Sequence, residues 1–209
     1  MVIQGTQEWQ NCRTGKITAS NIYKILTRTK TGYGADREHY LMQLLTERMT
    51  GQRTEIYTNS SMQWGTDQEP YARAAYEVAF DQMVDTVGFI DHPYINMAGA
   101  SPDGLVGDAG LIEIKCPETK TALVVWLTGK IDDKYWHQMH WQMACTGRKW
   151  CDYAVFDPRL PGHLQLYQKR VKQCDMWVEN AEKEIGLFLA ELAERQDKLE
   201  TLRLVREGH

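Results

Sequence analysis

Long hydrophobic runs are missing from this chain. No apolar segment in its 209 residues approaches the length of ~18 residues that a membrane-spanning helix needs. The first residues, MVIQGTQE, have neither a basic head nor an apolar stretch, so no secretory signal is expected. No repeat, low-complexity tract or linker rich in proline, glycine and serine is visible. These absences exclude collagen, coiled-coil arrays, extended disorder and a membrane partner, and they favour one domain over residues 1–209.

Cysteine pairs of the kind that bind zinc or form disulfide frameworks are also missing. The sequence has 5 cysteines, none in a C-x-x-C pair: Cys12, Cys116, Cys145, Cys151 and Cys174. A scattered set predicts neither a structural zinc site nor disulfides, and a reducing, cytosolic compartment is expected. His137 and His140 have H-x-x-H spacing, but no third zinc ligand is evident.

The charge is acidic overall but unevenly distributed. There are 24 basic and 28 acidic residues, a net charge of −4, which argues against a general polyanion binder. Residues 1–53 nevertheless carry a net charge of +4, so the rest of the chain carries −8. This division fits DNA binding beside a metal site. Ordinary patterning of helix surfaces is the alternative.

Hydrophobic periodicity predicts blocks of helices and strands. Helical spacing is found over residues 18–28, 36–50 (ended by Gly51), about 66–80, 133–147 and 175–206. Strand patterns cover 83–90, 94–99, 111–116, 150–156 and 164–171. Residues 51–63 predict a polar loop. The order indicates an α/β (α+β) fold with a central mixed β-sheet flanked by helices. It has a basic helical part (1–53), a core (64–171) and a long C-terminal helix (175–206).

The pattern with most chemical content lies between residues 100 and 117. Alternate strand side chains share a face, so Glu113 and Lys115 point one way while Ile112 and Ile114 point into the core. A charged pair on an apolar strand is costly to bury. A hairpin through the turn at residues 106–110 would bring the carboxylate of Asp103 beside Glu113.

These groups together predict a metal-dependent nuclease site. The carboxylates of Asp103 and Glu113, with the backbone carbonyl of Ile114, form the hard-oxygen set that Mg²⁺ prefers. Lys115 could orient or deprotonate a water, or stabilise charge that builds on phosphorus. Such chemistry cleaves phosphodiesters. A surface hairpin with a cross-strand Glu–Lys pair is the alternative.

The same residues carry a resemblance to a known family. Pro102-Asp103 followed by Glu113-Ile114-Lys115 is similar to the pattern of the PD-(D/E)XK nuclease superfamily. The wider series resembles bacteriophage lambda exonuclease and its viral recombinase relatives over about residues 9–160. That series comprises Trp9 to Arg13, Gly15, Ile17 to Ser20, Trp64-Gly65, Glu69, Ser101 to Leu105, Glu113 to Pro117, Tyr135, Gln138, Gln142 and Asp157 to Arg159.

The resemblance implies a restriction-endonuclease-like core and a role for each catalytic residue. Asp103, Glu113 and the carbonyl of Ile114 would ligate Mg²⁺, for which Mn²⁺ could substitute. Lys115 would act on the attacking water, and Gln138 would hold that lysine. Without the resemblance, Gln138 reads as a polar residue on a solvated helix. Glu69 would be a carboxylate near the metal, although Thr66 and Glu69 also have the spacing of a helix capping box.

The resemblance also implies residues that bind the end of a DNA strand. Arg13, Ser20 and Ser101 would form a pocket for the 5′-phosphate, and Met62 would part the last base pair. Arginine offers a fork of donors to phosphate oxygens, and a hydroxyl at a helix start joins free N–H groups. The alternatives are a surface charge for Arg13, a plain helix cap for Ser20 and packing for Met62.

The activity implied is that of a Mg²⁺-dependent 5′-to-3′ exonuclease on linear double-stranded DNA. It would release 5′-mononucleotides and leave 3′ single-stranded tails for recombination by strand annealing. The resemblance implies a homotrimeric ring and a single-strand annealing protein as partner. It also implies that the protein is encoded by a phage or prophage and acts in the cytoplasm of a bacterial host. The C-terminal helix would pack on the core or contact a neighbouring subunit. A structure-specific endonuclease of the same fold and a non-catalytic DNA-end-binding protein remain alternatives.

Overall fold

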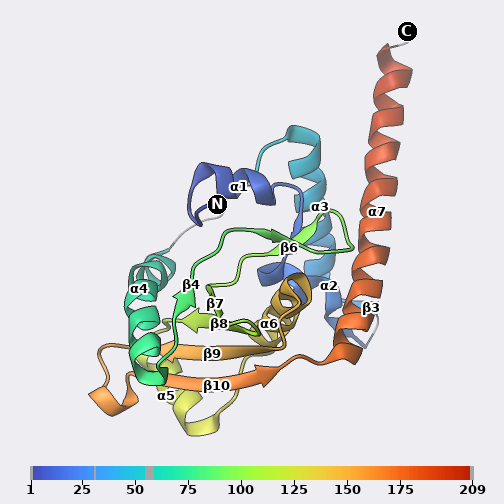
Figure 1. Cartoon of the computed structure of the whole chain (residues 1–209). Helices are drawn as coiled ribbons and strands as arrows, with labels where there is room; N and C mark the ends of the chain where they lie inside the picture. Colours follow the sequence, from blue (N-terminus) through green and yellow to red (C-terminus); the bar gives the residue numbers. More distant parts are fainter. Residues whose placement is uncertain (1, 31, 55–58, 208–209) are drawn as a thin grey trace.

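A mixed β-sheet forms the centre of the molecule (Figure 1). The computed structural model describes residues 2–30, 32–54 and 59–207, with side chains as far as residue 202. In this part the central sheet has the strand order β10-β9-β8-β7-β4. The strands are β4 (Val84–Asp85), β7 (Gly104–Val106), β8 (Gly110–Lys115), β9 (Trp150–Phe156) and β10 (Leu166–Lys172). β8 and β9 are parallel and the other neighbours are antiparallel, so the predicted mixed sheet is confirmed.

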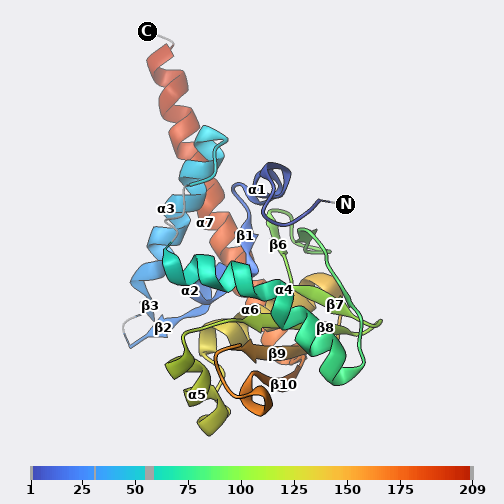
Figure 2. The ribbon, with the colours of Figure 1, turned by 90° about the vertical axis from the view of Figure 1, so that its left-hand side faces the viewer.

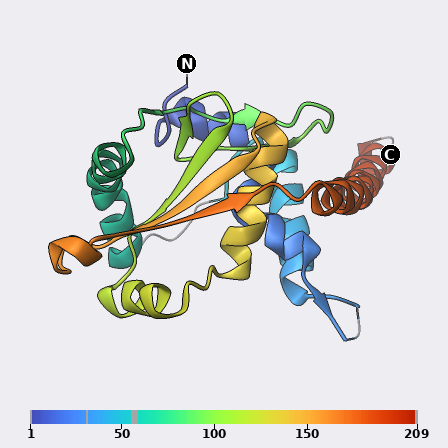
Figure 3. The same cartoon turned by 60° about the horizontal axis from the view of Figure 1, so that its bottom comes forward.

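Helices cover both faces of this sheet. On one face, α4 (Ser60–Phe80) contributes Tyr76 to a buried cluster with Ile112 of β8. On the other face, α5 (Thr119–Thr128) and α6 (Asp133–Thr146) lie over β8, where Met139 joins Leu111. Figure 3 shows α4 (teal) on one side of the strands and α5 (yellow) on the other. β8 is therefore buried on both faces, and any charge that it carries must find partners inside the protein.

A second core joins the two ends of the chain. A small sheet of β1 (Ile17–Thr18), β6 (Ala98–Ala100) and β5 (Ile90–Asp91) lies beside α2 (Ile22–Leu26) and α3 (Ala35–Thr50). Leu41 of α3 and Phe188 of α7 (Asp175–Glu207) belong to this core together with Trp141 of α6. α1 (Gln7–Arg13) precedes β1, and β2 (Arg28–Thr29) pairs with β3 (Gly32–Tyr33). Gly51 ends α3 in a left-handed conformation (φ 68°), as predicted.

The long C-terminal helix is confirmed, and its two halves differ. Ile185, Phe188 and Leu192 lie fully buried in the second core. Arg195 beyond them still donates hydrogen bonds to Glu38 of α3, and only the end of the helix extends past the rest of the molecule (Figures 1 and 2). Leu199 and Leu202 on this outer part are exposed. Packing on the core therefore accounts for the first half of the helix only. No helix among the described residues combines the length and the apolarity that crossing a bilayer would need.

Several predicted boundaries are wrong. The predicted helix 18–28 is a short 3₁₀ helix (Ala19–Asn21) followed by α2, so Ser20 lies inside a 3₁₀ turn and does not cap a helix. α4 begins at Ser60 because Asn59 accepts a hydrogen bond from the backbone N–H of Met62 at 2.9 Å. The predicted loop 51–63 therefore ends at residue 59, and residues 55–58 lie outside the described part.

The strand prediction for residues 83–99 also needs correction. The predicted strand 83–90 is present only as β4 and the first residue of β5, and the strand predicted at 94–99 is the shorter β6. α1 and α5 were not predicted. α5 has the sequence TKTALVVWLT, whose continuous apolar run has no helical period. The prediction that residues 1–209 form one domain in three parts stays a prediction.

Candidate active site

Asp103 and Ile114 meet at the open end of the β7–β8 hairpin. The register pairs Gly104 with Ile112, so Asp103 lies just beyond the paired part of β7. Its Oδ2 accepts a hydrogen bond from the backbone N–H of Ile114 at 2.7 Å. The N–H and C=O of one residue point to the same side of an antiparallel ladder. The carbonyl of Ile114 is therefore expected on the side where Asp103 lies.

Glu113 is fully buried between the sheet and α6, with 0% of its surface exposed. Gln138 donates a hydrogen bond from Nε2 to its Oε1, and Gln142 donates from Nε2 to its Oε2, both at 2.7 Å. Residues i and i+4 share one side of a helix, which explains how both amides reach one carboxylate. Lys115 forms an ion pair with Oε1. Glu113 thus has the donors that a buried charge needs.

The contact of Gln138 differs from the role that the resemblance implies. We expected this glutamine to hold Lys115, but its amide donates to Glu113. Any effect of Gln138 on the lysine therefore passes through the carboxylate that both of them contact. The prediction that Gln138 lies on a solvated helix face is not supported, because this amide points into the site.

Two carboxylates set the charge state of Lys115. Burial by itself lowers the pKa of Lys115, but Glu113 and then Asp103 outweigh burial and raise this pKa above its usual range. The ammonium lies 4.8 Å from the ring centre of Tyr135. Burial and the nearby charge of Glu113 raise the pKa of Asp103 well above its usual range. Lys115 is therefore a hydrogen-bond donor and a positive charge in this structure.

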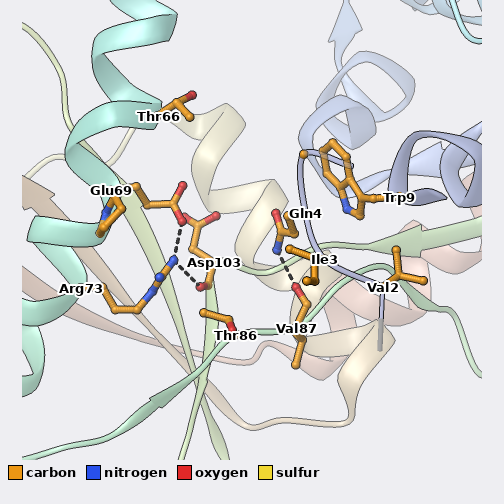
Figure 4. Close-up of a pocket in the computed structure, with 12 residues that line it drawn as sticks. Val2, Ile3, Gln4, Trp9, Thr66, Glu69, Arg73, Thr86, Val87 and Asp103 are labelled. Carbon is orange, nitrogen blue, oxygen red and sulfur yellow. Dashed lines mark hydrogen bonds and ion pairs between the residues drawn. The ribbon is translucent and has the colours of Figure 1, made fainter. Parts of the chain in front are cut away.

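Glu69 lies near the same group, on α4. Arg73 follows it by one helical turn and donates a hydrogen bond to its Oε1 at 2.5 Å (Figure 4). The same guanidinium lies 3.5 Å from the backbone carbonyl of Asp103. Burial raises the pKa of Glu69, and Glu69 in turn acts electrostatically on Asp103. The capping-box prediction is wrong, because Thr66 lies inside α4 and donates to the carbonyl of Met62 at 3.2 Å.

Two cavities lie on either side of Glu69 and Asp103, which line both. The first has a volume of about 570 Å³ and is also lined by Lys115, Ile114 and Met62. Met62 is about half exposed there, at 46%, and is not part of a buried cluster. The second has a volume of about 550 Å³ and is lined by residues 2–5, Trp9 and Arg73. Chain segments distant in the sequence therefore approach the carboxylates from both sides.

Two of the three predicted phosphate-binding residues, Arg13 and Ser101, contact Trp9. The guanidinium of Arg13 stacks on the Trp9 ring at 3.8 Å, and the indole N–H donates to Ser101 Oγ at 2.9 Å. Burial and nearby Arg53 lower the pKa of Arg13 to about 10, and its Nε is buried without a partner. Ser20 and Ser101 both follow the ends of the parallel strands β1 and β6, where Thr18 pairs with Gly99. Among the described contacts, none joins Ser20 to Arg13 or Ser101 directly.

The donor set fits a divalent cation in its chemistry. The described residues contain no group of three or more His, Cys, Asp and Glu side chains placed to hold a metal. A cation here would therefore use the two carboxylates of Asp103 and Glu113, the Ile114 carbonyl and water, all of them hard oxygen donors. Burial first, and then the nearby charges of Glu113 and Glu69, raise the pKa of Asp103, and a bound cation would favour its ionised form. His137 and His140 instead pack around Trp177.

Sequence reasoning missed two residues of this site. Gln142 was named only as a residue of the resemblance, without a role, yet it donates a hydrogen bond to one oxygen of Glu113. Arg73 was not considered, yet it contacts both Glu69 and the Asp103 backbone. The available signal was the i, i+4 spacing from Gln138 and from Glu69, which places each missed residue beside a predicted one.

Comparison with known proteins identifies the family. The model of the YqaJ-like viral recombinase domain matches residues 8–149. The alkaline exonuclease LHK-Exo from Laribacter hongkongensis is 44% identical, and the alignment covers 95% of this chain and 98% of that one. Its structure superposes with a TM-score of 0.89, and its structure in complex with dAMP with 0.90.

A more distant structure shares the fold alone. The phage-related exonuclease from Haemophilus somnus 129PT has a TM-score of 0.69 at 11% identity, over 88% of this chain and 96% of that one. No curated protein matches the chain. The resemblance to viral recombinases is confirmed, and with it the fold class. The chain belongs to the YqaJ-like viral recombinase family.

Proposed function

We propose that this protein is a DNA exonuclease, and specifically a Mg²⁺-dependent 5′-to-3′ exonuclease on linear double-stranded DNA. It would release 5′-mononucleotides and leave 3′ single-stranded tails. The observation that carries the proposal is the convergence of Asp103, Glu113 and Lys115 beside two cavities. Family membership and the likeness to an alkaline exonuclease support it.

Each residue of the site has a chemical task in this proposal. Asp103, Glu113 and the Ile114 carbonyl would hold Mg²⁺, or Mn²⁺ in its place. When bound, the cation supplies Lewis-acid stabilisation of the charge on the phosphoryl oxygens. Gln138 and Gln142 orient the Glu113 carboxylate. The Lys115 ammonium would orient a water and stabilise charge that develops on the phosphate.

The preference for a 5′ end would come from the group around Trp9. Arg13 has a buried Nε without a hydrogen-bond partner, and Ser101 accepts a hydrogen bond from the indole N–H of Trp9. Arginine and hydroxyl donors suit a terminal phosphate. Ser20 would join them from the end of β1. Met62, which lines the cavity with Lys115, would part the last base pair. An enzyme that holds a terminal phosphate selects chain ends.

The assembly would be a homotrimeric ring around DNA, with a single-strand annealing protein as partner. The net charge of +4 in residues 1–53 would concentrate positive potential where DNA passes, while the rest of the surface stays acidic. Exposed leucines on the outer part of α7 are available for a neighbouring subunit. The protein would act in the cytoplasm of a bacterial host as a phage or prophage product.

A digestion time course tests this function. Linear duplex DNA is labelled at either the 5′ or the 3′ end, carries a 5′-phosphate or a 5′-hydroxyl, and is incubated with and without Mg²⁺. We expect Mg²⁺-dependent release of 5′ label as mononucleotides, with a faster rate on phosphorylated ends. Closed circular DNA serves as the control. Nicking of circles would favour the endonuclease, and binding to ends without any release would favour the non-catalytic protein.

A further inference from the structure

Residues 2–5 lie across one side of the second cavity, and we name them the strap. In Figure 4, Val2, Ile3 and Gln4 of the strap lie opposite Glu69 and Asp103, with the cavity between them. No part of the strap belongs to a helix or a strand. Its position is therefore set by its contacts with the rest of the protein.

Gln4 makes the most specific of these contacts. Its side-chain amide Nε2 donates to the backbone carbonyl of Val87 at 2.8 Å and to that of Pro102 at 2.9 Å. Val87 lies between β4 and β5, and Pro102 directly precedes Asp103. One amide therefore joins the strap, the connection after β4 and the loop that carries a proposed metal ligand. A residue that only covered the surface would not need two long-range acceptors.

Gly88 provides a second, independent contact with the strap. It is buried, and a Cβ atom added to it would lie 2.2 Å from the backbone carbonyl oxygen of Val2. Atoms cannot approach this closely, so any side chain at position 88 would displace the backbone of the strap. The strap thus lies against a position where only glycine allows it to rest.

The cavity that the strap closes suits one nucleotide. Its volume of about 550 Å³ falls within the range of small-ligand sites. One end is formed by Glu69 and Asp103, and the other by Trp9, which contacts the phosphate-binding candidates Arg13 and Ser101. A nucleotide held there would have its 5′-phosphate near Arg13 and its 3′ side toward the carboxylates.

We infer that the strap is a wall of the binding site for the terminal deoxynucleotide, and that Gln4 is the positioning residue that holds it in place. This inference rests on the proposed exonuclease function and adds a part of the chain that the motif residues do not include. The strap would act mainly on binding of the strand end, because its atoms face the cavity and lie apart from Lys115 and Glu113.

Two substitutions displace the strap by different routes. Gln4→Leu keeps the size of the side chain and removes the amide donors. Gly88→Ala leaves Gln4 intact and introduces a methyl group against the Val2 carbonyl. Gly162→Ala is the matched control, because no atom lies within 4 Å of its added Cβ. All are compared with the unmodified protein by calorimetric titration with dAMP in the presence of Mg²⁺, by digestion kinetics and by thermal unfolding.

We expect Gln4→Leu and Gly88→Ala each to weaken dAMP binding by about tenfold, or about 1.4 kcal/mol, because each change displaces the strap from the wall of the cavity. The KM for duplex ends should rise by a similar factor while kcat changes less. The double variant should bind dAMP as tightly as the single variant with the lower affinity, because both changes displace the same segment. Gly162→Ala should behave as the unmodified protein.

Unchanged dAMP affinity in both variants would overturn the inference. A lower unfolding temperature with unchanged dAMP affinity would do the same, because it would give Gln4 a role in stability alone. Failure of the proposed function looks different. If the unmodified protein binds dAMP more tightly than Gln4→Leu but releases no nucleotides from DNA, the exonuclease proposal is wrong. The role of the strap in nucleotide binding is then still supported.

Discussion

Glu113 is a charged side chain that almost no solvent reaches, and three donors surround it. A buried carboxylate is costly unless it is paired and hydrogen-bonded, and Gln138, Gln142 and Lys115 meet that requirement. The carbonyl oxygen of Gln142 is nevertheless buried without a partner. A hydrophobic residue would avoid that cost, so the position of this amide is better explained by its effect on Glu113.

Replacing Lys115 tests its catalytic role. Lys115→Ala removes the ammonium that lies beside Glu113, so charge on the phosphate would lose its stabilising partner. We expect the rate of nucleotide release to fall by about a hundredfold or more, while binding to duplex ends persists. Binding is measured by fluorescence anisotropy and release by gel. A variant that digests DNA at the normal rate would remove Lys115 from the mechanism.

Replacing Gln142 tests the orientation of Glu113. Gln142→Met keeps the side-chain length and removes the N–H that donates to Oε2. Loss of a group that orients a metal ligand typically weakens metal affinity by about 10–100-fold. We therefore expect the Mg²⁺ concentration at half-maximal activity to rise within that range, and Mn²⁺ titration without DNA to show the same change. An unchanged metal requirement would leave Gln142 a role in packing alone.

At the scale of elements, the start of α4 decides where Glu69 lies. Asn59 accepts a hydrogen bond from the backbone N–H of Met62 and so begins the helix before residue 60. The helix thereby carries Met62 into one cavity and Glu69 between both. Had the helix begun at Thr66, the Glu69 side chain would have accepted a hydrogen bond from the free backbone N–H at the helix start, as in a capping box.

This start can be tested by comparing two substitutions. Asn59→Ala removes the cap and should lower stability by about 1 kcal/mol, or about 2–4 °C in the unfolding temperature for a chain of this size. Thr66→Ala lies inside the helix and should change stability by less than about 0.5 kcal/mol. Thermal unfolding followed by circular dichroism measures both. A larger effect at Thr66 than at Asn59 would contradict the observed helix start.

Histidines at the base of α7 make the attachment of this helix sensitive to pH. Burial lowers the pKa of His92, His137 and His140. His92 Nε2 lies 3.3 Å from Glu182 of α7, and the other two rings pack on Trp177. Each histidine therefore binds fewer protons in the folded state. Above the unfolded pKa, about 6.5, the histidines are neutral in both states and the folded state keeps its full stability. As the pH falls toward the folded pKa, the unfolded state takes up protons first and the folded state loses stability.

We expect the unfolding temperature to drop between about pH 7.5 and about pH 5. The variant His137→Gln/His140→Gln has no imidazole at these positions and should show a smaller drop over the same interval. Differential scanning fluorimetry at matched ionic strength measures both proteins. Equal pH dependence in the two would show that these histidines do not carry the effect.

At the scale of the whole molecule, the proposed ring predicts the mass of the protein in solution and the salt dependence of its DNA binding. Light scattering should give the mass of three chains in solution, and association with duplex ends should weaken steeply with salt, because counterions are released from DNA. Dilution series control for weak self-association. A monomer that still digests linear DNA would refute the ring while leaving the nuclease intact.

Much of the site was predictable because it depends on local spacing. The alternation from Ile112 to Lys115 correctly places Glu113 and Lys115 on one face, since strand geometry has a period of two. The interval from Asp103 to Glu113 correctly indicated the hairpin, because a short Gly-containing turn leaves few other arrangements. The start of α4 could not be predicted, because residues 60–65 contain only two apolar side chains, Met62 and Trp64, which are too few to show a helical period.

The sequence by itself determined which chemical groups this protein has and which of them share a strand face or a helix face, because period and spacing are properties of a few neighbouring residues. Only the tertiary structure decided that Gln138 and Gln142 bond to Glu113, that Glu69 and Arg73 come beside Asp103, and that residues 2–5 close a cavity. Those contacts join segments up to 98 positions apart. They follow from how helices and loops pack around the sheet, which no local pattern encodes.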